Sequence, residues 1–230
     1  VSKEMYCFED RGGRRLTLRP EGTAGAVRAY VEHSLGQVQP IQRWWYMGPM
    51  YRAERPQKGR YRQFYQVGAE VFGIASAECD VEMLQMLVML CQNIGIHDVT
   101  LRLNTLGDSE SRQHYRSQLQ TFLQAFHDKL CESCQHRLQH NPLRVLDCKR
   151  DACRDICKNA PDMLHSLTPA AQEHFARVLH LLDALHIPYV RDAKLVRGLD
   201  YYTGIIFECT TQHLGSQDAI LGGGRYDALV

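Results

Sequence analysis

The sequence predicts an α+β fold in which a small helical domain is inserted into a domain of mixed strands and helices. Strand-like and helix-like segments mix up to about residue 104, helical spacing follows, and strand patterns return from residue 187. That order is typical of an α+β domain that carries an insertion. The 230 residues, 44% of them hydrophobic, suffice for a sizeable core and a small appended domain.

The first part of the strand-containing domain is expected at residues 1–107. Apolar residues recur at helical spacing over residues 81–94, and Ser76 stands where this helix would have its N-cap. Residues 99–103 alternate between apolar and polar side chains as a strand does. We therefore expect a helix followed by a strand at the end of this part.

Two further strands are expected at residues 46–52 and from residue 60 onward, joined as a hairpin by a polar, basic loop. Period two gives the second strand one mostly apolar face, which we expect to pack on the core: Tyr61, Tyr65, Val67, Ala69 and Val71. The other face combines cations, an aromatic ring, an amide, a bare backbone and a carboxylate: Arg60, Arg62, Phe64, Gln66, Gly68 and Glu70. This polar row suits a ligand with phosphates at one end and an ammonium or imidazole at the other, and a solvated face with ion pairs is the alternative.

Residues 108–187 are expected to form the helical insertion. One amphipathic helix is marked by Tyr115, Leu119, Phe122 and Phe126. A second helix is expected to begin with Thr168 as its N-cap and Pro169 as its first residue.

The second part of the strand-containing domain is expected at residues 188–230. Strand patterns cover residues 187–190 and 205–210. The run from Gly222 to Gly224 predicts a turn. The chain therefore returns to its first domain after the insertion.

Composition limits the function classes. The formal net charge of +1 gives no global attraction for nucleic acid, so RNA binding would need local basic patches. No stretch is apolar enough for a membrane span, and no membrane partner is expected. The nine cysteines, in a chain that shows no signal peptide, fit reduced thiols in a cytoplasmic protein better than a disulfide framework. Because the polar residues 1–4 open in folded-looking sequence, we expect an internal part of a longer protein.

Four motifs resemble those of histidyl-tRNA synthetases, which are class II aminoacyl-tRNA synthetases. Residues 51–57 and 59–64, Tyr-Arg-Ala-Glu-Arg-Pro-Gln and Gly-Arg-Tyr-Arg-Gln-Phe, are similar to the second class II signature motif in its histidyl form. Residues 18–23 resemble the amino-acid-binding loop, residues 195–204 the segment of histidine-specific members, and residues 223–227 a further family motif. The resemblance implies a class II antiparallel sheet flanked by helices, with an inserted small helical domain.

The resemblance implies a histidine–tRNA ligase, which activates L-histidine with ATP to histidyl-adenylate and transfers it to the 3′ end of histidine tRNA. Mg²⁺ would accompany the ATP, and no tightly bound cofactor is implied. Two catalytic residues follow from the motifs: Arg52, on the ATP α-phosphate and the histidine carboxylate, and Arg197, by the α-phosphate, where most class II relatives rely on a metal ion. The remaining ATP contacts are implied for Glu54, Arg60 and Phe64, the last of which would stack on adenine.

The same resemblance implies a histidine pocket. Three residues would receive the α-ammonium group: Glu21, Thr23 and Gln66. Glu70 and Tyr202 would hydrogen-bond the two imidazole nitrogens, a double contact that discriminates strongly against other amino acids. The other residues implied in this pocket are Gly22, Arg52, Arg197, Tyr201 and Tyr226.

Contacts with the tRNA acceptor end are implied for Gln57 and Arg62. The insertion matches the family's insertion domain, which approaches the acceptor stem, and its basic residues fit phosphate contact: Arg112, Arg116, Arg137, Arg144, Lys149 and Arg150. A homodimer is expected for the full-length protein, with the dimer-interface motif before residue 1. The third class II motif and the anticodon-binding domain are expected beyond residue 230.

The cysteines of the insertion raise the question of a structural zinc ion. Cys-x-x-Cys with further thiols nearby is a zinc spacing, and the candidate ligands are Cys131, Cys134, Cys148 and either Cys153 or Cys157. Helix-borne cysteines are often plain core residues, the family does not generally require zinc, and residues 141–147 are themselves family-like. The sequence therefore favours core thiols over zinc.

Two alternatives share the expected fold. A non-catalytic paralogue would sense histidine, like the regulatory subunit of ATP phosphoribosyltransferase, or uncharged tRNA, like the synthetase-like domain of a stress-sensing kinase. Such relatives typically lose residues that are present here: Arg52, Arg60, Arg197, Tyr201 and Tyr202. A class II synthetase of another specificity would lack the histidine-specific segment.

Overall fold

The computed structural model describes residues 4–55, 60–197, 201–212 and 219–230. The described residues divide into two units, one of residues 4–55, 60–75 and 229–230, and one of residues 76–197, 201–212 and 219–228. The strands of the described residues form two two-stranded sheets and one four-stranded sheet, and all but one of the strand pairs are antiparallel. The predicted α+β class is confirmed.

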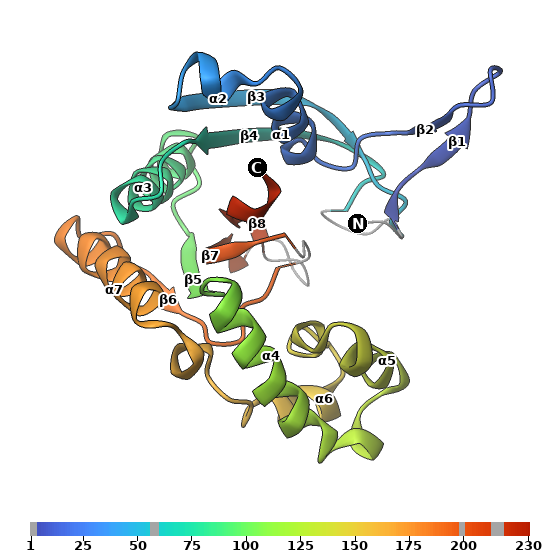
Figure 1. Ribbon diagram of the computed structural model, residues 1–230, viewed down its shortest axis with the longest axis vertical. Helices are drawn as coiled ribbons and strands as arrows, with labels where there is room; N and C mark the ends of the chain where they lie inside the picture. Colours follow the sequence, from blue (N-terminus) through green and yellow to red (C-terminus); the bar gives the residue numbers. More distant parts are fainter. Residues whose placement is uncertain (1–3, 56–59, 198–200, 213–218) are drawn as a thin grey trace. The chain divides into compact units, whose positions relative to one another are not determined.

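The first unit begins with a small hairpin and two helices (Figure 1). β1 (Cys7–Glu9) pairs antiparallel with β2 (Arg15–Thr17). α1 (Thr23–Glu32) and the short α2 (Leu35–Val38) follow. Together they lead the chain into the longest strands of the unit.

These strands, β3 (Gln42–Tyr51) and β4 (Gln63–Phe72), form an antiparallel pair over their whole length, as the sequence predicts. One face packs against α1, where the Tyr30 ring stacks on the Phe72 ring with centroids 4.4 Å apart. The same face carries residues 64, 66, 68, 70 and 72, which alternate with the opposite face. Arg60 and Arg62 of the predicted polar row precede β4, so the strand begins later than the sequence predicts.

The opposite face of the β3–β4 hairpin is apolar but exposed. Trp45 is 76% exposed and Val67 is 60% exposed, and Met47 and Tyr65 are exposed as well. Tyr61, which was predicted on this face, precedes β4 and is also exposed. The prediction that this face of β4 packs on a core is therefore wrong for the described chain. The alternation correctly placed these side chains on one face, but α1 covers the other one.

The second unit is built on the four-stranded sheet. β5 (Thr100–Thr105) lies between β6 (Val190–Arg191), its parallel neighbour, and β7 (Thr203–Thr210), its antiparallel neighbour. β8 (Ala219–Arg225) pairs antiparallel with β7. The predicted strand at residues 187–190 is largely wrong, because only Val190 of it belongs to β6.

Two helices pack with this sheet, and both predicted caps are confirmed. α3 (Ala77–Asn93) begins after Ser76, whose side chain accepts a hydrogen bond from the Cys79 N–H. α7 (Pro169–Ala184) begins after Thr168, which accepts from the Ala171 N–H. Their apolar faces and the strands share one buried cluster: Leu84, Leu101, Leu103, Val178, Leu182 and Phe207 are among its members.

The predicted turn at residues 222–224 is wrong, because these glycines lie inside β8. A Cβ on Gly222 would lie 2.7 Å from Nη2 of Arg197, and one on Gly223 would lie 2.7 Å from the Phe207 ring. A Cβ on Gly224 would lie 2.8 Å from the Ile205 carbonyl oxygen. The glycines therefore allow neighbouring groups to pack closely against the backbone of β8, and they do not mark a turn.

Residues 108–187, the predicted insertion, are mainly helical, but the second helix predicted in it, α7, packs with the four-stranded sheet instead. The name insertion is kept below for the segment from α4 to η4. Its elements follow one another as α4 (Ser109–Gln124), η2 (His127–Lys129), α5 (Glu132–His140), η3 (Pro142–Val145), α6 (Asp151–Cys157) and η4 (Met163–Ser166). They enclose a core of their own, which includes Tyr115, Leu119, Leu123, Leu138, Val145 and Met163. In the described residues of the whole chain, no helix is long and apolar enough to cross a membrane.

Candidate functional site

In the first unit, Glu21 holds the start of α1. Its carboxylate accepts hydrogen bonds from the backbone N–H of Thr23 at 2.6 Å and of Ala24 at 3.0 Å. The first amide groups of a helix have no partner within the helix, so a carboxylate here satisfies them and complements the helix dipole. Gly22 is the N-cap residue and offers no side chain for this task.

Glu70 is a buried carboxylate, only 6% exposed, on the face of β4 that lies against α1. Its Oε1 accepts hydrogen bonds from the Thr23 hydroxyl at 2.8 Å and from the Tyr46 hydroxyl at 3.0 Å. Burial raises the pKa of Tyr46, and the Glu70 carboxylate raises it further, so this hydroxyl keeps its proton and donates. The structure thus brings together Thr23 and Glu70, as predicted for the histidine pocket.

Tyr46 was missed by the sequence analysis. It lies directly opposite Gly68 on the neighbouring strand, and its ring fills the space where side chains at Gly22 and Gly68 would be. A Cβ on either glycine would lie 2.1 Å from a ring atom of Tyr46. The signal was the glycine at position 68 within a strand pattern, since such a glycine marks a close approach.

Gln66 lies on the same face of β4 and presents a buried acceptor. Its Oε1 accepts no hydrogen bond from the residues that the structure describes. A buried acceptor without a donor costs free energy, roughly 1–3 kcal/mol, and an added N–H group relieves that cost. Gln66 is therefore suited to bind a donor such as an ammonium group.

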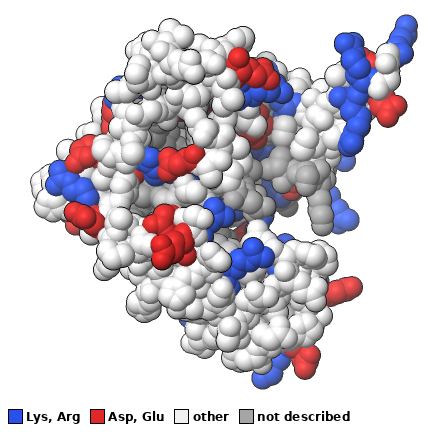
Figure 2. All heavy atoms as spheres, viewed as in Figure 1, with Lys and Arg blue, Asp and Glu red and all other residues white. Residues whose placement is uncertain are grey.

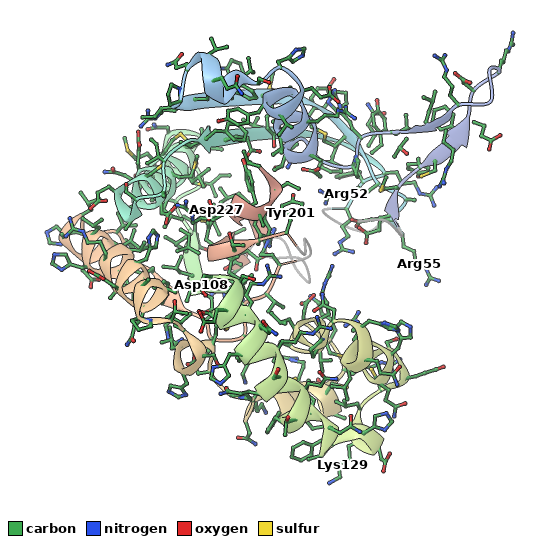
Figure 3. The ribbon with its side chains drawn as sticks, in the orientation of Figure 1. Arg52, Arg55, Asp108, Lys129, Tyr201 and Asp227 are labelled. Atoms are coloured by element: carbon green, nitrogen blue, oxygen red, sulfur yellow. The ribbon has the colours of Figure 1, made fainter. Side chains whose placement is uncertain are left out.

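The predicted ATP residues of the first unit gather in two contacting pairs near the adjoining ends of β3 and β4. The guanidinium of Arg52, which Figure 3 labels, lies over the Phe64 ring at 4.8 Å. Its Nε donates to the Pro20 carbonyl oxygen at 2.8 Å. Arg60 forms an ion pair with Glu54 at 3.2 Å. Both pairs place a cation where a phosphate could bind.

Of the two residues predicted to contact the tRNA acceptor end, the structure describes only one. Arg62 is exposed and its Nε donates to the Glu54 carbonyl oxygen at 3.2 Å. Gln57 lies outside the described residues. Elsewhere in the first unit, Figure 2 shows Lys and Arg gathered over the β1–β2 hairpin, where Arg14 and Arg15 are exposed.

The basic residues of the insertion are divided in their roles. Arg116 donates to the His140 carbonyl oxygen and Arg137 to that of Arg144, both at 3.0 Å, so these two arginines stabilise the insertion itself. Lys149 and Arg150 are exposed. The exposed pair is better placed for a phosphate partner than the half-buried Arg137.

In the second unit, Arg197 is fixed against the β7–β8 pair. Its Nη1 forms an ion pair with Glu208 of β7, and the guanidinium lies on the bare backbone of Gly222. Its Nε is buried and has no hydrogen-bond partner in the described part of the chain. Glu208 was missed by the sequence analysis, although it is the one charged residue in the predicted strand at residues 205–210, which was a usable signal.

The three predicted tyrosines lie together in the second unit. The Tyr201 ring lies 5.1 Å from the Tyr202 ring and 6.1 Å from the Tyr226 ring, measured between centroids. Tyr202 is buried in a small cluster with Leu106, Leu195 and Ile206. Tyr201 is labelled in Figure 3, as is Asp227, the residue that follows Tyr226.

Among the residues that the structure describes, one group of side chains in the second unit could hold a metal ion. The sulfur atoms of four cysteines all lie within 4.8 Å of one another: Cys131, Cys134, Cys148 and Cys153. Burial alone would raise the pKa of the Cys131 thiol, but hydrogen bonds with the Cys134 backbone and with the neighbouring thiols outweigh it and lower that pKa to about 7. The sequence offers either Cys153 or Cys157 as the fourth candidate ligand. Cys153 belongs to the group, and Cys157 contacts the Val145 carbonyl oxygen instead.

Comparison with known proteins gives consistent results. The family model described as "Histidyl-tRNA synthetase" matches residues 1–230. The chain is 50% identical to a histidine–tRNA ligase of Syntrophotalea carbinolica and 49% identical to one of Desulfatibacillum aliphaticivorans, in each case over the whole chain and 55% of the relative. The chain thus spans about half the length of the curated relatives that it matches.

Solved structures share the fold. The apo histidyl-tRNA synthetase of Staphylococcus aureus matches with a TM-score of 0.78 at 37% identity, over 99% of this chain and 55% of that one. An ATP phosphoribosyltransferase regulatory subunit/histidyl-tRNA synthetase from Bacillus halodurans matches with a TM-score of 0.68 at 21% identity, over 100% of this chain and 62% of that one. At that identity the second match supports the fold alone.

Proposed function

The chain belongs to the histidyl-tRNA synthetase family, and from this premise we propose that it is the central catalytic part of a histidine–tRNA ligase. The protein would activate L-histidine with ATP to histidyl-adenylate and transfer the amino acid to the 3′ end of histidine tRNA. Because the chain spans 55% of its curated relatives, the activity is assigned to the full-length protein, which we propose to be a cytoplasmic homodimer.

The observation that carries this proposal is the buried acceptor set on the α1-facing side of β4. Glu70 is a buried carboxylate that receives two hydroxyl donors, and Gln66 offers a buried oxygen without a donor. Such acceptors favour a ligand that donates N–H bonds, as the ammonium and imidazole groups of histidine do.

We assign the α-ammonium group to Gln66 and Thr23, with Glu21 as the nearby negative charge, and an imidazole nitrogen to Glu70. Gly22 contributes its bare backbone, since a side chain there would displace the Tyr46 ring. In the second unit, the tyrosine cluster is assigned to histidine as well, with Tyr202 on the other imidazole nitrogen and with Tyr201 and Tyr226 beside it.

The adenylation step needs positive charge at the α-phosphate. An oxygen of the histidine carboxylate forms a bond to the α-phosphorus, the bond to the leaving oxygen breaks, and pyrophosphate departs with the electron pair. Arg52 and Arg197 would stabilise the charge that develops there, and Glu208 with Gly222 keeps the Arg197 guanidinium in place.

The other ATP contacts are proposed for the Glu54–Arg60 pair and Phe64, with Mg²⁺ bound to the ATP as part of that substrate. Gln57 and Arg62 are assigned to the acceptor end of tRNA, and the basic residues of the insertion to its phosphates. The exposed Lys149 and Arg150 are the strongest candidates among the latter, because their side chains are free of the packing that engages Arg137.

The test is histidine-dependent ATP–pyrophosphate exchange by the full-length protein. We expect exchange in the wild type and a loss on the order of 10²–10³-fold in Arg197→Ala, the range seen when one transition-state donor is removed. The matched control is Arg177→Ala, which removes an arginine that forms an exposed ion pair with Glu78 in the same unit. The control should exchange at the wild-type rate.

A regulatory paralogue is not favoured, because the curated relatives at 49–50% identity are histidine–tRNA ligases. The experiment separates the two functions directly. Histidine binding by calorimetry without any pyrophosphate exchange would identify a sensor and would remove the catalytic roles given to Arg52 and Arg197.

A further inference from the structure

We propose that Cys131, Cys134, Cys148 and Cys153 bind one Zn²⁺ ion, which cross-links the second half of the insertion. The four thiols come from two separate stretches of chain, yet each sulfur atom lies within 4.8 Å of the other three. This convergence is independent of the proposed ligase activity, because the cluster belongs to the core of the insertion.

The distances match those that a zinc ion requires. With Zn–S bonds of about 2.3 Å, a tetrahedral site holds its sulfur atoms about 3.8 Å apart. The Sγ atoms of Cys131 and Cys148 are 3.9 Å apart, and the whole set lies within 4.8 Å. Zinc binding therefore needs only small side-chain adjustments.

The local structure presents the thiols in the manner of a zinc site. Cys131 is the N-cap residue of α5 and Cys134 lies in the first turn of that helix, so the two thiols of the Cys-x-x-Cys pair point to the same place. Cys148 follows η3, and Cys153 lies early in α6. Two short helices and the connection between them thus meet at one point.

Hydrogen bonding also supports metal ligation. The backbone N–H of Cys131 lies 3.3 Å from Sγ of Cys153 and donates to it. Such amide donors stabilise a thiolate and fix the direction of a ligating sulfur atom. On zinc binding the thiols lose their protons to solvent, and the exposed Lys149 and Arg150 next to Cys148 would offset part of the negative charge of four thiolates.

Cys157 shows how a plain core cysteine behaves in the same region. It is also buried and also lies in α6, but its thiol donates to the Val145 carbonyl oxygen rather than joining the four-sulfur group. This contrast weighs against the sequence-based preference for core thiols at the other four positions. Burial alone does not require four thiols to point toward one another.

The experiment measures metal in the full-length protein, purified under reducing conditions without added metal. Mass spectrometry of the metals should find about one zinc per chain in the wild type and less than about a tenth of that in Cys131→Ser and Cys148→Ser. Cys131 is the most exposed of the four, so serine there is the mildest change. Cys157→Ala is the matched control and should keep the wild-type zinc content.

A second measurement keeps the proposal testable if a variant folds poorly. Replacement of the metal of the wild type by Co²⁺ should give the thiolate-to-cobalt absorption of a tetrahedral sulfur site, and chelation should lower Tm by roughly 5 °C or more, reversed by Zn²⁺. Three results would each overturn the proposal: reduced protein that binds no added Zn²⁺, iron in place of zinc, or loss of zinc in Cys157→Ala to the same extent as in Cys148→Ser.

Discussion

The β3–β4 hairpin of the first unit and the helical insertion of the second differ in how far they bury their apolar side chains. The hairpin covers one face with α1 and leaves the other bare, with Trp45 76% exposed. The insertion closes a core of its own, in which Leu119 and Leu123 are fully buried. The periodicity of a segment shows which side chains share a face, whereas only the rest of the protein decides whether that face is covered.

The largest expected contrast is in stability. Leu119→Ala opens a cavity in the insertion core and should lower the free energy of unfolding by about 2–5 kcal/mol. Val67→Ala, on the bare face of the hairpin, should change it by less than about 0.5 kcal/mol in the 230-residue chain. Urea unfolding of both variants measures the difference, and equal effects would contradict the contrast.

Urea unfolding of Val67→Ala in the full-length protein tests whether the apolar face of the hairpin is covered there. We expect Val67→Ala to become distinctly destabilising there, because the chain spans only 55% of its relatives and the remaining sequence is available to cover the apolar face. An unchanged, near-zero effect in the full-length protein would show that this face stays in contact with water.

A substitution on the face of the hairpin that α1 covers should change histidine binding. Tyr46→Phe removes the hydroxyl that donates to Glu70 Oε1 and leaves the Thr23 donor, at a cost of about 1 kcal/mol, and should raise KM for histidine about five- to tenfold with little change in kcat. Pyrophosphate exchange at varied histidine concentration measures the two constants. A fall in kcat with unchanged KM would contradict the role of Tyr46 in positioning Glu70.

Acid should loosen the insertion more than the hairpin. The hydrogen bond from Arg191 lowers the pKa of Asp162, whose ion pair connects the start of η4 to β6. A carboxyl with a lowered pKa stabilises the folded state above its unfolded pKa of about 3.9, and that contribution, about 1 kcal/mol, disappears as the pH falls through the folded pKa. Below about pH 4, protection against hydrogen exchange in the insertion, corrected for the intrinsic exchange rate, should therefore fall in the wild type. Asp162→Asn should show this loss of protection already at neutral pH.

The smallest effect on stability is expected from charges on the bare face. Met47 and Val67 lie directly opposite each other, so Met47→Glu with Val67→Lys places an ion pair across the strands. In the 230-residue chain this double variant should bind less of an apolar dye and keep its unfolding midpoint. Gln120→Glu with Gln124→Lys, on exposed positions of α4, is the matched control and should leave dye binding unchanged.

Local signals were sufficient for much of the fold. Ser76 and Thr168 were recognisable as caps because a cap depends on neighbouring residues in the sequence, and both bonds are present. The glycines at 222–224 were misplaced as a turn for the opposite reason. Their role depends on Arg197, Phe207 and Ile205, which are distant in sequence.

The same difference between local and distant signals applies to the residues of the candidate site. The side chains on the polar face of β4 could be listed from period two, and the structure places Gln66 and Glu70 together with Tyr46 on that face. Tyr46 and Glu208 could not be found in this way, because each acts through a partner on another strand or loop. The thiol cluster was visible as a spacing, but its convergence required coordinates.

The Tyr46 ring between Gly22 and Gly68 has a consequence for the evolution of the family. A methyl group at either glycine would overlap the ring, so neither position can change while the tyrosine stays. A smaller residue at position 46 would release both constraints and would also remove the hydroxyl that holds Glu70. Positions 22, 46 and 68 should therefore be inherited as a unit, and lineages that abandon one of them should be those that have also abandoned histidine.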